Sequence, residues 1–346
     1  MRKNARLSDA GAGTHAAAPT RMVPIDVMRA VSMLYIVGFW HLLDYTKVVG
    51  WHYNPVTYRL TVGALALFVL ISGFLTGRKD GGLARGELWR FYETRFWRIY
   101  LPFVVASGLF LAAGVSDTLA LVKGVTLVAM LFAPPPFTLW FVNMIVLFYL
   151  IAPLLIALRK NEMAYIALCA VIVGAMTLYQ AETGRIDMRL IIYFPCFAAG
   201  IFLAARSLPS STPGLIGFLL IAALALLPTL VRPSGSLEAD PWAAPWALFG
   251  SIAVFVLVMR AGRNLKSPAI LMQLSEASFF MYLLHRPIYH WMQIVWFPST
   301  EKDQIFYLLF VCLPIIGIVA WLCQRGYAGF LQRRELRVGA PLTSDD

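Results

Sequence analysis

The chain has 346 residues, of which 60% are hydrophobic and only 14% are charged, and its formal net charge is +11. Soluble domains average about 25% charged residues, so this composition excludes a soluble globular protein and predicts an integral membrane protein. The Lys and Arg residues cluster between apolar runs, which is typical of cytoplasmic membrane loops and not of a nucleic-acid-binding surface.

Residues 1–22 are mostly small and polar, with a weakly basic character and no apolar stretch of the kind a signal peptide needs. We expect them to form a disordered cytosolic tail.

The segment 23–45 is predicted to be the first transmembrane helix. Asp26 and Arg29 lie near its start and His41 near its end. A helix rises 1.5 Å per residue, which puts Arg29 and His41 about 18 Å apart, near opposite faces of the membrane. Ionisable groups at the edges of a membrane span are candidates for function. The alternative is that Arg29 is an ordinary snorkelling side chain and His41 an interfacial one.

Further apolar segments are predicted to span the membrane. They are 57–76, 99–115, 137–158, 163–180, 189–205, 213–231, 242–260, 277–296 and 305–325.

A shorter apolar run at 119–133 has fifteen residues, below the ~20 that a span usually needs. If it does not cross, the most basic loops all face the cytoplasm, as the positive-inside rule favours. We therefore predict an all-α bundle of about ten transmembrane helices with both termini cytoplasmic. In this interpretation 119–133 is a short re-entrant or interfacial helix, 23–326 is one membrane domain and 327–346 is a cytosolic basic tail.

The longest predicted loop, residues 77–98, lies inside and carries six bases against three acids. Arg95 and Arg98 are three residues apart, a spacing that places both guanidinium groups on one helix face. Two such groups suit a phosphate, because each binds two oxygens at once. An anchor for anionic lipid is the alternative.

Polar residues inside the other apolar runs have structural as well as functional interpretations. Ser72 and Gly73 indicate either close helix packing or the lining of a narrow channel. Asn143, next to Trp140, predicts an interhelical hydrogen bond. His285 lies midway along its span before Arg286, which makes it a site candidate, with a packing histidine near a proline kink as the alternative. The four cysteines are predicted to be buried hydrophobes, neither disulfide-bonded nor metal-binding.

Taken in order, these motifs resemble the acyltransferase-3 family of membrane acyltransferases. The motif residues are Asp26, Arg29 and His41, then Phe68 to Phe74, then Arg95, Arg98, Ile99 and Pro102, then Leu139 to Phe141, and last Ser278 to His285 with Tyr282 between them. The family usually has ten residues between the Arg and the His, whereas eleven intervene here. At 100° per residue, ten place the His about 20° from the Arg and eleven about 120°. Either a π-bulge near Gly38 restores the alignment or Arg29 contributes differently.

The resemblance implies transfer of an acyl group, most often acetyl from acetyl-CoA, to a hydroxyl of an extracytoplasmic sugar, exopolysaccharide or lipid-linked glycan. It implies a multi-pass protein of the bacterial plasma (inner) membrane whose partners are acyl-CoA, a polysaccharide or glycolipid acceptor and membrane lipid. A polysaccharide biosynthesis complex is a candidate partner, and no nucleic acid, metal or permanently bound cofactor is expected.

The expected residue roles follow from the same resemblance. His41 is the catalytic base with Arg29 and Asp26 as further catalytic residues. Arg95, Arg98, Ser72 and Gly73 are expected to bind acyl-CoA, and His285, Trp140 and Tyr282 the acceptor or the thioester. Succinyl-CoA is an alternative donor. A transporter or flippase for a glycan or small anion, and a scaffold subunit of a polysaccharide export complex, are alternative functions.

Overall fold

A computed structural model describes residues 22–41, 43–46, 52–78, 84–136, 138–207, 211–231, 239–262 and 268–338. Within these ranges every regular element is a helix and no strand is present. The predicted all-α fold is therefore confirmed, and the predicted N-terminal tail lies almost wholly outside the described residues.

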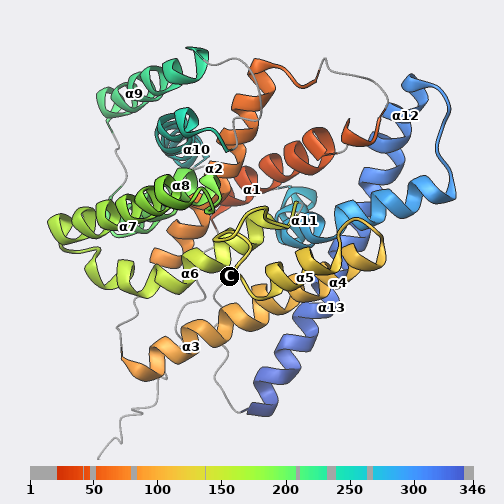
Figure 1. Cartoon of the computed structure of the whole chain (residues 1–346), viewed down its shortest axis with the longest axis horizontal. Helices are drawn as coiled ribbons and strands as arrows, with labels where there is room; N and C mark the ends of the chain where they lie inside the picture. The colour runs from red at the N-terminus through yellow and green to blue at the C-terminus, as the bar shows by residue number, and fades with distance from the viewer. Residues whose placement is uncertain are drawn as a thin grey trace, which may run out of the picture.

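The helices follow the predicted order along the chain (Figure 1). The first half contains α1 (Val23–Tyr35), the π-helix η1 (Ile36–His41), the 3-10 helix η2 (Leu43–Tyr45), α2 (Pro55–Gly77), α3 (Arg85–Arg95), the π-helix η3 (Phe96–Tyr100), α4 (Leu101–Ala112), α5 (Thr118–Val125) and α6 (Trp140–Leu158).

The second half contains α7 (Glu162–Thr183), α8 (Met188–Ala204), α9 (Thr212–Val231), the 3-10 helix η5 (Pro241–Ala243), the π-helix η6 (Trp246–Gly250), α10 (Ser251–Ala261), α11 (Ala269–Val295), α12 (Glu301–Tyr307), the π-helix η8 (Leu308–Cys312) and α13 (Leu313–Val338). Every predicted span contains one of these helices or a continuous series of them.

Among the described residues, eight helices are long and apolar enough to cross a membrane. They include the continuous helices Gly86–Ala112 and Glu301–Leu336, which combine α3 with α4 and α12 with α13. Two other predicted spans correspond to α8, a shorter apolar helix of 17 residues, and to the 27-residue α11. The chain is thus a polytopic helix bundle.

Two sequence predictions need correction. The loop expected at 77–98 is helical from Arg85 onward, because α3 continues through η3 into α4 without a break. The helix expected at 119–133 ends at Val125 and is followed by turns up to the prolines at 134–136. The Asp117 carboxylate caps the start of this helix by accepting a hydrogen bond from the Ala120 N–H at 2.7 Å.

The segment that contains α5 turns back along α4. The Tyr100 hydroxyl donates a 2.7 Å hydrogen bond to the carbonyl of Val125, the last residue of α5. Tyr100 precedes the end of α4 by twelve residues, about 18 Å along the helix. After α5 the chain reaches the α7–α8 turn, where the Ala133 N–H donates to the Arg185 carbonyl at 2.8 Å. The chain thus doubles back after α4, and whether the segment is re-entrant or interfacial stays a prediction.

Helices α2 and α8 approach each other unusually closely through glycines. A Cβ atom at Gly73 would lie 2.1 Å from the Phe197 carbonyl oxygen, and one at Gly200 would lie 2.1 Å from the Leu70 carbonyl oxygen. Only glycine leaves room for the two backbones at these positions. Gly73 therefore has the packing role, one of the two interpretations its sequence context allowed.

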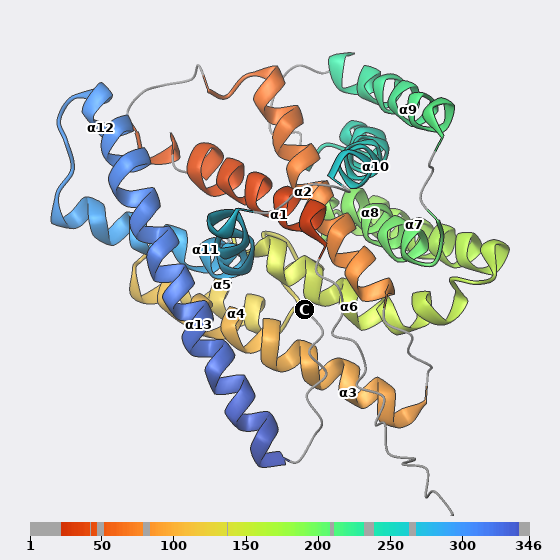
Figure 2. The same ribbon diagram turned by 180° about the vertical axis from the view of Figure 1, so that it is seen from behind.

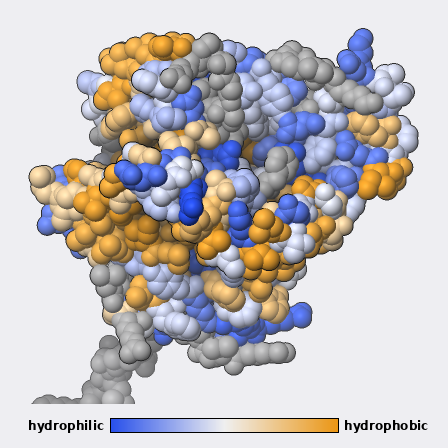
Figure 3. Space-filling view, in the orientation of Figure 1, coloured by the Kyte–Doolittle hydropathy of each residue, from blue (hydrophilic) through white to orange (hydrophobic). Residues whose placement is uncertain are grey.

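The outermost helices expose apolar side chains over most of their surface. Only 6% of the apolar window of α7 and 17% of that of α9 is buried within the protein. In Figure 1 these helices lie at the left and upper edges, and Figure 3 shows apolar residues gathered over both. Such faces are suited to contact with lipid tails.

At the other side of the molecule, α13 runs past α11 toward α3 (Figure 2). Its Arg334 pairs with Glu93 of α3, and the Tyr327 hydroxyl donates to the Trp97 carbonyl of η3. The helix continues to Val338, so it crosses the boundary predicted at 326 between the membrane domain and the basic tail.

We predict that Gly73→Ala destabilises the protein by about 1–3 kcal/mol, the usual effect of overpacking a tight contact. Thermal unfolding of the detergent-purified protein measures this change. Gly174→Ala in α7 is the matched control, because nothing lies within 4 Å of a Cβ there and alanine favours a helix. Equal stability of the two variants would contradict the packing role of Gly73.

Candidate active site

The start of α1 is fixed to α11 by a small polar network. The Ser275 hydroxyl donates a 2.7 Å hydrogen bond to the buried Asp26 carboxylate. The Arg29 guanidinium donates to the Ser278 hydroxyl at 3.2 Å, and that hydroxyl donates in turn to the Ser275 carbonyl at 2.7 Å. Asp26 and Arg29 therefore both face α11, and their charges are held by hydrogen bonds that a bilayer interior requires.

The other end of the first helix meets α11 through two histidines. The imidazole rings of His41 and His285 are nearly parallel, with an angle of 8° between their planes and 4.9 Å between their centres. Asp26 precedes His41 in the first helix, and their partners Ser275 and His285 follow each other in the same order in α11, so the two helices run in the same direction. Successive membrane spans alternate in direction. The first and the ninth predicted spans should therefore be parallel, as observed.

A π-helical turn resolves the spacing between Arg29 and His41. Residues Ile36–His41 form η1, which contains Gly38, the position at which the sequence predicted a π-bulge. Compared with the family's ten-residue gap, the eleventh residue would rotate His41 by a further 100° around an α-helix. A π-helical turn accommodates one extra residue and so cancels this rotation. Arg29 and His41 consequently contact the same neighbour, α11, and the alignment of their faces is confirmed.

The His285 ring has a defined tautomer. Its Nδ1 lies 2.7 Å from the Tyr282 carbonyl oxygen, and since a carbonyl only accepts, the hydrogen is on Nδ1. In the neutral ring the Nε2 atom then carries a lone pair. Both this Nε2 and the Nδ1 of His41 are buried and have no hydrogen-bond partner among the residues that the structure describes. Buried polar atoms of this kind are uncommon in folded proteins and call for an explanation.

Tyr282 connects the histidine pair to the start of α6. Its hydroxyl donates to the Thr138 carbonyl, and its ring centre lies 5.6 Å from those of both Phe141 and His285. Thr138 has a φ of 61°, a conformation that is rare for a β-branched residue. Tyr282 is thus a wall of the histidine site, as its expected role requires.

An ion pair that the sequence analysis did not predict lies beside the histidines. Arg286 donates a 2.9 Å hydrogen bond to the Asp44 carboxylate, and its guanidinium carbon lies 5.3 Å from the centre of the Tyr45 ring. The Arg286 side chain is only 6% exposed, so its charge needs this carboxylate. The sequence indicates that an arginine within a span needs an acidic partner, but it does not indicate which acid supplies it.

Trp140 faces α8 and is not in ring contact with either histidine. The Arg189 guanidinium carbon lies 4.4 Å from the centre of the Trp140 ring, and Tyr193 stacks on the same ring at 6.3 Å. Asp187 lies 3.5 Å from Arg189. Phe141 lies between Trp140 and Tyr282: its ring centre is 5.8 Å from that of Trp140 and 5.6 Å from that of Tyr282. We call these three rings the aromatic wall.

The residues expected to bind acyl-CoA do not form one cluster. The Arg95 guanidinium carbon lies over the rings of Phe91 and Tyr149, at 4.0 and 5.4 Å. Arg98 instead lies 3.9 Å from Glu335 of α13. The π-helix η3, which begins at residue 96, widens the angle between Arg95 and Arg98 beyond that of an α-helix, so the two turn to different neighbours. The common face predicted from their spacing is not present in this state.

Ser72 and Gly73 also differ in their surroundings. Gly73 is covered by Phe197 of α8, so it does not line a channel. Ser72 is partly exposed, and its hydroxyl donates to the Phe68 carbonyl of the same helix at 2.9 Å. Asn143 has the interhelical role that was predicted, since its amide donates to the Gly124 carbonyl of α5 at 2.7 Å.

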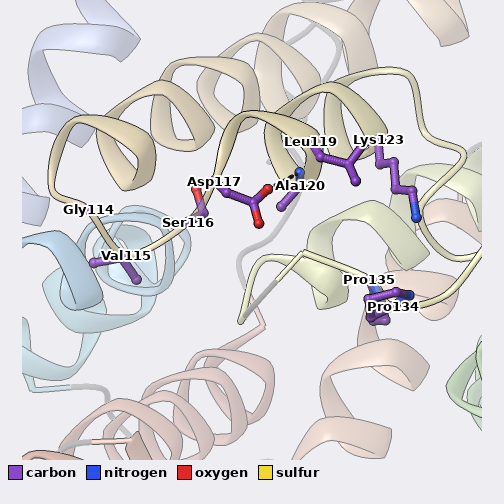
Figure 4. Close-up of a pocket in the computed structure, with 9 residues that line it drawn as sticks. All are labelled: Gly114, Val115, Ser116, Asp117, Leu119, Ala120, Lys123, Pro134 and Pro135. Carbon is purple, nitrogen blue, oxygen red and sulfur yellow. Dashed lines mark hydrogen bonds between the residues drawn. The ribbon is translucent and has the colours of Figure 1, made fainter.

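A cavity of about 470 Å³ opens between the α4–α5 turn and the prolines before α6 (Figure 4). Ser116, Asp117, Lys123 and Pro134 are among its lining residues. None of the predicted site residues is among the described residues that line it. The cavity is therefore separate from the histidine pair.

A family model for an acyltransferase domain, the acyltransferase-3 model, matches residues 23–324, nearly the whole chain. The chain belongs to the acyltransferase-3 family. It is accordingly a membrane acyltransferase with several apolar helices. Searches of curated proteins and of solved structures gave no match.

For this acyltransferase we predict that Asp44→Asn lowers the free energy of unfolding by about 1.5–3 kcal/mol, the range for hydrogen bonds to charged groups. The loss arises because Arg286 stays buried without its counter-charge. Glu162→Gln is the control, since Glu162 pairs with Arg206 at 2.6 Å but is 64% exposed. That change should cost at most about 1 kcal/mol. Unfolding in detergent measures both variants, and equal losses would contradict the dependence of the buried Arg286 on the partly exposed Asp44.

Proposed function

We propose that this membrane acyltransferase moves an acetyl group from cytosolic acetyl-CoA to a hydroxyl of a sugar, exopolysaccharide or lipid-linked glycan outside the cytoplasm. Its place would be the bacterial plasma (inner) membrane. The observation that carries the proposal is the pairing of His41 with His285, each with a buried ring nitrogen that has no partner within the described part of the chain. Transfer from a thioester to a hydroxyl needs a proton acceptor of this type, and family membership supplies the reaction class.

The basic residues of α3 and η3 support the donor side of the proposal. Arg95 and Arg98 directly precede the span predicted at 99–115, on the side that the positive-inside rule assigns to the cytoplasm, where acyl-CoA is found. The Arg98 side chain is 29% exposed and so can exchange Glu335 for a phosphate. Arg95 can act as a second cation if the two guanidinium groups turn toward one another around the bound anion.

Ser72 and Gly73 have unequal parts in the proposal. The Ser72 side chain of α2 is partly exposed and can contact the pantetheine arm of the donor. Gly73 contributes indirectly, because it permits the close contact between α2 and α8 that fixes α2 in place.

The acceptor side involves the aromatic wall that includes Tyr282 and, through Phe141, Trp140. In the proposed reaction His41 removes the proton of the acceptor hydroxyl, whose oxygen attacks the thioester carbon. An imidazole suits this step because its ordinary titration range lies close to neutral pH. Asp26 and Arg29 keep the start of α1 in register with α11, so that the other end presents His41 to His285.

We predict that the double variant Arg95→Ala/Arg98→Ala binds acetyl-CoA at least about tenfold more weakly than the unchanged protein, because each lost charged hydrogen bond weakens binding by about 1.5–3 kcal/mol. Binding to the detergent-purified protein measures the effect. Arg206→Ala is the control, since that arginine pairs with Glu162 between α7 and α8. No binding of acetyl-CoA by folded, unchanged protein would contradict the proposed donor and favour a transporter or flippase.

A further inference from the structure

The two unpartnered histidine atoms lie in neighbouring rings. Nε2 of His285 is an acceptor, because the hydrogen on that ring is held on Nδ1 by the Tyr282 carbonyl. Nδ1 of His41 is the other buried atom without a partner. Two imidazole rings joined by an N–H···N hydrogen bond have centres roughly 5 Å apart. The centres of these parallel rings are 4.9 Å apart, so the rings are close enough for the bond once one of them turns.

The two histidines also differ in burial. His285 is completely buried, whereas His41 as a whole residue is partly exposed. A substrate can therefore reach His41 first, with His285 behind it. This is the arrangement in which one residue performs the proton transfer and the other orients it.

We infer that His285 is a positioning residue whose Nε2 accepts a hydrogen bond from Nδ1–H of His41, which leaves the lone pair of His41 on Nε2, facing the acceptor hydroxyl. In this structure the two rings are parallel and do not make this bond, so the His41 ring must turn about its Cβ–Cγ bond to form it. The inference rests on the proposed function and assigns a role to the buried histidine within it. It also accounts for both unpartnered atoms with one interaction.

The reaction then balances without any further group. The hydroxyl proton moves to Nε2 of His41, and the oxygen forms a bond to the thioester carbon. The tetrahedral intermediate breaks its carbon–sulfur bond, and the departing sulfur takes the proton from Nε2 of His41. His285 keeps its own hydrogen on Nδ1 throughout and stabilises the imidazolium form of His41 through the Nδ1–H bond.

Two variants of similar size separate this role from packing. His285→Gln keeps an acceptor oxygen near the place of Nε2, whereas His285→Met fills the same volume without a strong acceptor. We expect the Met variant to transfer acetyl groups about 10²-fold or more slowly than the unchanged protein at saturating acetyl-CoA. The Gln variant should be at least about tenfold faster than the Met variant, and the Kd for acetyl-CoA should stay within about twofold in both.

The assay uses membranes of cells that produce the full chain, supplied with radiolabelled acetyl-CoA, and counts alkali-labile label in the membrane and glycan fractions. His290→Gln on the same helix is the control and should leave the rate unchanged. If the Met variant does not fold, His285→Asn replaces it, because its amide still donates to the Tyr282 carbonyl but does not reach His41. Thermal unfolding of each variant establishes that it is folded.

Equal rates for the Gln variant and the Met or Asn variant, or a folded Met or Asn variant as fast as the unchanged protein, would overturn the inference. Failure of the unchanged protein to transfer label would instead count against the proposed function. The two failures are thus distinguishable within one set of membranes.

Discussion

The contact between α1 and α11 is the constraint on which the rest of the site depends. These helices lie far apart in the sequence, yet the polar residues of one find their partners on the other at both ends. In an apolar medium such partners are needed, because an unpaired buried charge or polar group is strongly unfavourable. The same requirement that holds the helices together therefore brings His41 against His285.

The rest of the bundle supports this pair of helices. Glycines let α2 and α8 approach closely, and the segment that contains α5 bonds to both η3 and α6. Helices α7 and α9 bury little of their surface and separate the bundle from lipid. The two histidines consequently lie on well-packed inner helices, and such packing supplies the fixed geometry that the proposed reaction needs.

Features determined by local sequence could be predicted. Apolar length and loop charge located the helices, and the eleven-residue gap between Arg29 and His41 indicated the π-turn that η1 contains. The glycine at position 73 was recognised as a packing candidate. The resemblance to the family located His285 and Tyr282, which do meet His41.

Features determined by contacts between distant residues could not be predicted. Asp44 and Arg286 pair only because α1 and α11 lie side by side, and neither residue specifies that alone. Arg95 and Arg98 were expected on one face from their spacing, but the π-helix η3 and the neighbours on α6 and α13 turn them apart. The end of α5 was missed because an apolar composition does not reveal that turns replace the helix after Val125.

The proposed function requires that one histidine site joins a cytosolic donor to an acceptor on the other side of the membrane. Its most direct test uses sealed inverted vesicles, whose cytoplasmic face is outside, incubated with radiolabelled acetyl-CoA that does not cross the bilayer. Transfer across the membrane predicts ester label that resists an added acetylesterase, a protein that does not cross the bilayer, until the vesicles are opened with detergent. Label that the added esterase releases from intact vesicles would contradict transfer across the membrane.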